Sequence, residues 1–214
     1  GWSDARALFL RSVKEEARSV ESPSGQGYAL LVGDVLYVGV RMTAPGGPLK
    51  AQGGHWGPEG DDGVELDFRA VIGRTKGAVF VLHGFPSGDL ESVTDGGAGD
   101  AAARRMQEAV TYAAAIGGDG RWSCEFGIPL SALDLPVADV KKLYFNLGAR
   151  RNGAAGGPWF AFARTRGANY EVDRAAVLHL DGAVAAAAEN LLRNGGFESA
   201  EAGPWTVASN SGDP

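Results

Sequence analysis

Two adjacent carboxylates, Asp61 and Asp62, are the clearest candidates for metal chemistry in this sequence. Hard cations such as calcium take carboxylate and carbonyl oxygens as ligands. The pair stands in a glycine-rich stretch without the spacing of an EF-hand loop, so a role in a turn is the alternative. The three histidines, His55, His83 and His179, show no spacing typical of a metal site.

The sequence lacks the patterns of known catalytic and nucleotide-binding sites. It contains no Gly-x-Ser-x-Gly nucleophile motif, no phosphate-binding loop and no dinucleotide fingerprint. Nothing in it resembles a glycosidase motif, although the carboxylate pair of a glycosidase is diagnosed only by its separation in space. The single cysteine, Cys124, excludes an intrachain disulfide and a thiolate zinc cluster. We therefore expect a protein that is not an enzyme.

Length and charge limit the class of protein further. The chain has 214 residues, which suits one domain, or one domain plus a fragment. Its formal net charge of −6 argues against nucleic acid as a partner, because nucleic-acid binding needs a basic surface. No run of apolar residues reaches the ~18 that a membrane helix requires, so no membrane partner is expected either.

Alternating apolar residues predict about ten short strands, separated by turns in which many of the 33 glycines stand. Trp122, Cys124 and Phe126 alternate with polar residues, which indicates a strand with one buried face, and Pro129 ends it. The dipeptide Gly33-Asp34 indicates a hairpin. This pattern predicts an all-β fold, a two-sheet antiparallel β-sandwich with long loops. The expected strands are Ala5–Leu10, Tyr28–Val32, Val35–Met42, Val64–Phe68, Gly77–Phe85, Ala109–Ile116, Trp122–Phe126, Leu143–Leu147, Trp159–Ala163 and Ala176–Leu180.

Other segments are predicted to be loops or linkers. Thr43–Gly63 is a long loop of the kind that often carries function. Ser87–Gly99 is polar and glycine-rich, and Asp100–Glu108 has no firm apolar stripe, so we expect at most a helical turn there. Ala183–Ala188 is a run of alanines that indicates a linker or a short helix.

Three segments, by their order and spacing, resemble family 9 carbohydrate-binding modules and related DOMON-like domains. They are Asp61-Asp62-Gly-Val-Glu65, Trp122-x-x-Glu125-x-x-Ile-Pro-Leu and Phe145-Asn146-Leu147. The resemblance covers roughly residues 2–180 and implies a β-sandwich domain over residues 1–182. The segment Asn190–Glu198 is similar to the opening strand of a jelly-roll carbohydrate-binding module. Residues 183–214 are therefore expected to be a linker and the truncated first strand of a following module.

This resemblance implies a function. It points to a non-catalytic carbohydrate-binding module of a secreted, multimodular protein that acts on polysaccharide, in an extracellular or periplasmic location. The expected partners are an oligo- or polysaccharide and the covalently linked neighbouring modules. Related modules often hold structural calcium, for which Asp61 and Asp62 are the candidates here. The alternative is a spacer or protein-interaction module of the same fold without sugar affinity.

The resemblance also implies a binding site. In family 9 modules two aromatic side chains clamp a terminal sugar ring, and polar side chains bind its hydroxyl groups. The first clamp position corresponds to Trp56 and the second falls within Trp159–Phe162, where Trp159 is the larger ring and Phe162 fits the register better. Glu65 occupies the family's carboxylate position. Each of these residues has a structural alternative: either tryptophan can cap the sheet, and Glu65 can face solvent or pair with an arginine.

Two polar positions depart from the family pattern. The family's sugar-binding arginine appears as Val81 in this sequence, and a ligand-contacting glutamine appears as Gly148. Arg150, with its neighbour Arg151, is a candidate substitute for the missing groups. DOMON-like relatives include haem proteins with a Met/His pair. Met42, however, falls on the apolar face of its strand, where filling the core is the default role, so no haem is expected.

Overall fold

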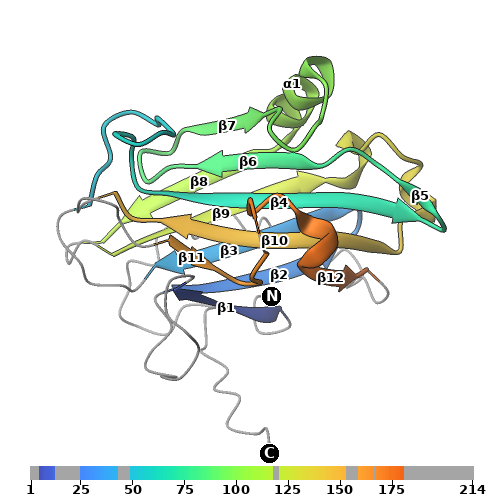
Figure 1. Cartoon of the computed structure of the whole chain (residues 1–214), viewed down its shortest axis with the longest axis horizontal. Coiled ribbons are helices and arrows are strands. Elements are labelled where there is room, and N and C mark those ends of the chain that lie inside the picture. Colours follow the sequence, from blue (N-terminus) through green and yellow to red (C-terminus); the bar gives the residue numbers. More distant parts are fainter. Residues whose placement is uncertain are drawn as a thin grey trace, which may run out of the picture.

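The structure is a computed structural model that describes residues 5–12, 25–42, 49–117, 121–152, 159–165 and 167–180. Its strands form two antiparallel sheets packed face to face, which confirms the predicted β-sandwich (Figure 1). Sheet A has the order β1–β2–β3–β9–β8. Its strands are β1 (Arg6–Ser12), β2 (Gly25–Val32), β3 (Val35–Met42), β9 (Trp122–Pro129) and β8 (Thr111–Ile116).

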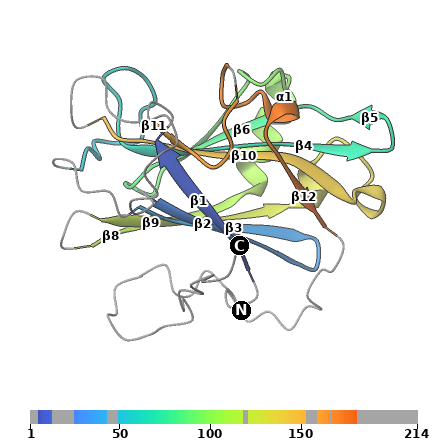
Figure 2. The same ribbon diagram turned by 60° about the horizontal axis from the view of Figure 1, so that its bottom comes forward.

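Sheet B has the order β7–β6–β4–β10–β11, with β5 beside β4 and β12 beside β10. Its strands are β7 (Leu90–Val93), β6 (Phe80–Gly84), β4 (Gly63–Ile72), β10 (Lys142–Arg150), β11 (Trp159–Ala161), β5 (Thr75–Lys76) and β12 (Ala176–His179). β1 joins the two sheets at one edge, because its first five residues pair with β2 and its last two pair with β11. The turned view in Figure 2 shows the two layers edge-on, with β1 running between them.

The core lies between the sheets and consists of the apolar residues that alternate along the strands. All seven residues that the alternation assigns to one core belong to it, and none is more than 3% exposed: Val64, Leu66, Phe68, Trp122, Phe126, Phe145 and Leu147. Met42 is also buried there, in the role that its position on an apolar strand face predicts. The Gly33-Asp34 hairpin is confirmed as well, with Gly33 at φ +60° between the paired residues Val32 and Val35.

The segment from Ser87 to Ala109 differs from the sequence prediction. It contains a strand, β7, and a ten-residue helix, α1 (Asp100–Ala109), instead of a loop and a single helical turn. Small residues form the buried stripe of α1, where Ala102 and Ala103 pack with Met106, so apolar periodicity is weak in the sequence. The helix lies beside the outer edge of β7, where the Ser92 backbone N–H donates to the Gln107 side chain.

Parts of the expected architecture lie outside the described residues. They include the linker and following strand expected over residues 183–214, and residues 43–48 of the long loop. Within the part of the chain that the structure describes, no helix has the length and hydropathy needed to cross a membrane.

Candidate functional site

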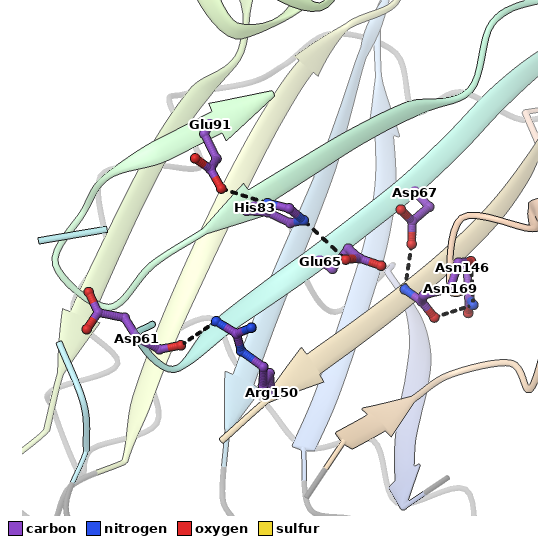
Figure 3. Close-up of polar contacts among 8 residues, drawn as sticks. All are labelled: Asp61, Glu65, Asp67, His83, Glu91, Asn146, Arg150 and Asn169. Atoms are coloured by element: carbon purple, nitrogen blue, oxygen red, sulfur yellow. Dashed lines mark hydrogen bonds and ion pairs between the residues drawn. The ribbon is translucent and has the colours of Figure 1, made fainter. Parts of the chain in front are cut away.

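The candidate site lies on the outer face of sheet B, at the end where β4 begins. Val64, Leu66 and Phe68 of β4 point into the core, so Glu65 and Asp67 between them face the other side of the sheet. The neighbouring strands are in register with β4: His83 of β6 pairs with Glu65, and Asn146 of β10 pairs with Asp67. Side chains from three strands therefore share one surface (Figure 3).

Two aspartates fix the loop that precedes β4. The Asp61 carboxylate accepts the backbone N–H groups of Gln52 and Gly54, both at 2.8 Å. The buried Asp62 carboxylate accepts Nε of Arg151 at 3.1 Å and the backbone N–H of Asn152 at 2.6 Å. Burial raises the pKa of Asp62, and the Asn152 N–H and the Arg151 charge oppose that shift. Asp61 thus closes the loop on itself, and Asp62 ties it to the residues that follow β10.

All four carboxylate oxygens of the pair accept hydrogen bonds in this arrangement. Among the described residues, no group of three or more His, Cys, Asp or Glu side chains has a geometry that could hold a metal ion. Calcium binding by Asp61 and Asp62 stays a prediction, which melting temperatures measured with calcium and with chelator would test.

The loop places the half-buried Trp56 at the centre of the site. Its indole stacks on the His83 imidazole, with ring centroids 3.9 Å apart and planes inclined by 7°. The Arg150 guanidinium carbon lies 4.0 Å from the indole centroid, within the range of a cation–π contact. Phe85 meets the indole edge-on with centroids 6.2 Å apart. A Cβ on Gly63 would stand 2.8 Å from the Trp56 ring, so glycine at the start of β4 makes room for the indole.

Trp159 completes an aromatic pair. Its ring meets Trp56 edge-on, with centroids 5.8 Å apart and planes inclined by 79°. Phe162 lies elsewhere: it packs against the core and meets Phe145 at 6.4 Å. The difference follows from the alternation along this segment, in which Phe160 also faces the core. Trp159, not Phe162, is therefore the second aromatic residue of the site.

His83 connects Glu65 to Glu91 of β7 and is almost completely buried. Its Nε2 lies 3.1 Å from a Glu65 oxygen, and its Nδ1 lies 2.8 Å from a Glu91 oxygen. An ionised carboxylate only accepts hydrogen bonds, and a neutral imidazole donates through one nitrogen only. Both bonds therefore need an imidazolium or a protonated carboxyl. Burial alone would lower the pKa of His83, but the bonds to Glu65 and Glu91 outweigh burial and raise it.

A second polar group continues from Glu65 along β4. Asn169 donates to the Asp67 carboxylate, and Asn146 donates to the Asn169 side-chain oxygen at 2.6 Å (Figure 3). Burial raises the pKa of Asp67 well above its ordinary range, and the neighbouring Glu65 charge adds to the shift. These bonds hold the segment that follows β11 against the outer face of the sheet.

Arg150 borders the site on the β10 side. Its Nη2 donates to the Asp61 backbone carbonyl at 3.1 Å. Its Nε is buried and has no hydrogen-bond partner in the part of the chain that the structure describes. Burial lowers the pKa of Arg150, and the nearby carboxylates, Glu65 first among them, oppose that shift.

Four of the five predicted sugar-contacting residues thus come together: Trp56, Glu65, Arg150 and Trp159. Sequence reasoning missed His83, Glu91 and Asn169 as members of the site. His83 stands among apolar residues in β6, where its position opposite Glu65 depends on the strand register. Glu91 falls in a segment that was expected to be a loop. Phe80 and Leu82 alternate into the core, so the same alternation turns His83 to the outer face of the sheet. This alternation could have indicated that His83 faces the site, but not which residues it contacts there.

Comparison with known proteins supports the fold. No family model matches the chain, and no curated protein matches it. One solved structure, described as a "putative carbohydrate-binding protein" from Bacteroides uniformis, has a TM-score of 0.58 to this chain at 12% sequence identity. The match covers 83% of this chain and 87% of that one. At this identity the likeness establishes a shared sandwich fold.

Proposed function

We propose that this chain is a non-catalytic carbohydrate-binding domain whose ligand binds where Trp56 and Trp159 meet. The observation that carries the proposal is the contact of two half-buried indoles beside Glu65 and Arg150 on one sheet face. A pyranose ring offers an apolar C–H face to an aromatic ring and hydroxyl groups at its rim. Carboxylate and guanidinium groups next to the indoles can bind those hydroxyls and so provide specificity.

Fold likeness to the Bacteroides uniformis protein supports the same function, since that protein is described as carbohydrate-binding. We further propose that the domain belongs to a secreted, multimodular protein acting on polysaccharide, in an extracellular or periplasmic location. There it would hold linked neighbouring modules near their substrate and raise their effective concentration without chemistry of its own.

A spacer or protein-interaction role is the second candidate, and one observation favours it. The Trp56 indole already packs against His83 and Arg150, so it serves as an internal part of the site. A sugar that stacks on Trp56 must displace at least one of these neighbours. A domain without sugar affinity would keep the same contacts permanently.

Titration against a glycan panel decides between the two functions. Isothermal titration with xylan, cellulose, mannan and galactan fragments should give Kd values on the order of 10 µM to 1 mM for a matching sugar, as expected for a shallow site. Trp159→Ala should abolish this binding and leave the fold intact. Phe9→Ala is the matched control, because Phe9 is an exposed aromatic residue (36%) on sheet A. If no glycan binds below ~10 mM, the spacer role holds instead.

A further inference from the structure

Three neighbouring side chains cover the Trp56 indole, and we call this the closed arrangement. The His83 imidazole stacks on the indole at 3.9 Å, Arg150 lies over it at 4.0 Å, and Trp159 meets it edge-on. Glu65, the carboxylate expected to bind sugar hydroxyls, has one oxygen engaged with His83 Nε2. A sugar that stacks on the His83-covered face of Trp56 and bonds to this Glu65 oxygen therefore requires both groups to be released, and His83 contacts both of them.

Ionisable side chains from three strands contact His83 or its immediate neighbours. Glu65 comes from β4 and Glu91 comes from β7, and Asp67 of β4 is the acidic neighbour of Glu65. Arg150, from β10, is on Trp56, the ring against which His83 stacks. Two carboxyl groups thus bond directly to the two nitrogens of the imidazole, and one further acidic and one basic side chain contact its neighbours Glu65 and Trp56.

We propose that protonated His83 holds Trp56 and Glu65 in the closed arrangement, and that release of this proton to solvent opens the sugar site. The inference rests on the proposed function and adds a regulator to it. His83 acts here as a positioning residue.

Proton loss removes the contacts that keep the site closed. A neutral imidazole donates to only one of the two carboxylates and turns a lone pair toward the other, which repels an ionised oxygen. The cation–π contribution to the stack on Trp56 disappears with the charge. Trp56 can then separate from His83 and offer its face to a sugar, while the Glu65 oxygen becomes available to a hydroxyl group. Binding should therefore strengthen as the pH rises through the His83 titration.

The first test needs no ligand. Heteronuclear NMR follows the His83 ring nitrogens and the Trp56 indole N–H between pH 5.5 and pH 9. We expect both to titrate with one midpoint, which lies above that of an ordinary histidine because the pKa of His83 is raised. A Trp56 signal that does not follow His83 would overturn the proposal.

The second test measures sugar affinity over the same pH range with a glycan that binds in the panel above. If only the open form binds, the apparent affinity falls almost tenfold for each pH unit below the His83 midpoint. His83→Gln should remove this dependence. Glu91→Gln, at a side chain that is 35% exposed, should lower the midpoint and shift the curve to lower pH, because one charge that favours the imidazolium is lost. Glu108→Gln, an exposed change on α1, is the control and should not shift it.

The two proposals fail separately. A glycan that binds with the same affinity at pH 6 and pH 9 would overturn the role of His83 and leave the binding function in place. Absence of glycan binding at every pH, with Trp56 still titrating together with His83, would overturn the binding function and leave only the coupling between His83 and Trp56 in place. Should His83→Gln not fold, as circular dichroism would show, the shift produced by Glu91→Gln decides the question.

Discussion

The Trp159 indole lies directly over Gly148, the residue of β10 that pairs with Glu65. A Cβ added to Gly148 would stand 3.0 Å from Cζ2 of Trp159 and 2.7 Å from Nδ2 of Asn169. The bare backbone at this position therefore lets Trp159 approach the sheet beside Glu65. Trp159 and Asn169 fill the space that a longer side chain at this position would take.

Gly148→Ala should displace Trp159 and weaken glycan binding at least tenfold, while the domain stays folded. Isothermal titration and thermal melts measure the two effects. Gly99→Ala is the control, because a Cβ there meets no atom within 4 Å and the backbone φ is −71°. It should cost less than about 1 kcal/mol of stability and leave binding unchanged. Equal affinities of both variants would show that Trp159 does not contact the sugar.

Asn146 holds the segment after β11 through bonds at both ends of its amide. Its Nδ2 donates to the backbone carbonyls of Ala163 and Asn169, and its Oδ1 accepts the N–H groups of Leu147 and Ala163, both at 3.0 Å. Asn146→Leu leaves several of these buried groups unpaired, so we expect a loss of about 3 kcal/mol in urea melts.

Amide exchange in residues 163–172 should also accelerate in Asn146→Leu. Gln52→Leu, at an exposed position, serves as the control and should change neither measurement. A variant with normal protection in residues 163–172 would show that other contacts hold this segment.

Trp122 is a core residue whose indole N–H is buried without a hydrogen-bond partner among the described residues. Trp122→Ala should cost roughly 3–5 kcal/mol, because it opens a large cavity between the sheets. Trp122→Phe keeps most of the ring and removes the unpaired donor, so it should cost at least ~2 kcal/mol less than the alanine change. Urea melts of both variants check this order, and equal costs would contradict it.

Local alternation was enough to predict the sandwich, because a strand with one buried face shows its pattern within a few residues. Val64, Leu66 and Phe68 are assigned to the core by spacing alone, and the structure places all three there. The helix α1 was underestimated because its buried stripe consists of alanines and one methionine, which carry little hydrophobic signal.

The polar network of the site was predicted only in part. Trp56, Glu65, Arg150 and Trp159 were reached through the resemblance, but the contacts among them depend on strand register. His83 meets Glu65 because β6 pairs with β4 in one register, and a shift by one residue would turn its side chain toward the core. Register is set by packing over the whole sheet, so no local pattern in β6 or β7 could indicate the contacts of His83 with Glu65 and Glu91.

Glu125 provides a pH-dependent test of stability on the other sheet. It faces outward from sheet A between its register partners Gly39 and Ala113, yet it is only 1% exposed. Neither of its carboxyl oxygens has a hydrogen-bond partner in the described part of the chain, and burial raises the pKa of Glu125 to about 8. The folded protein therefore keeps a proton on Glu125 at a pH where the unfolded chain has released it.

The direction in which stability changes with pH follows from the difference between the folded and unfolded pKa of Glu125. The unfolded value is 4.5, so between pH 4.5 and about 8 the native state binds more protons than the unfolded state. The contribution of Glu125 is fully favourable below pH 4.5 and is lost as the pH rises, at roughly 1.4 kcal/mol per pH unit. Glu125→Gln is neutral at every pH, so its stability relative to the parent protein should increase from pH 5 to pH 8 and level off above that.

Urea melts of the parent protein and Glu125→Gln at pH 5, 6.5, 8 and 9 measure this difference. His83 and Asp67, whose pKa values are also raised, produce slopes of the same sign in both proteins, so they cancel in the comparison. Glu59→Gln, at an exposed position, is the matched control and should show no such trend. A difference between parent and Glu125→Gln that stays constant from pH 5 to pH 9 would mean that Glu125 is ionised in the folded protein and that solvent or another group reaches its carboxylate.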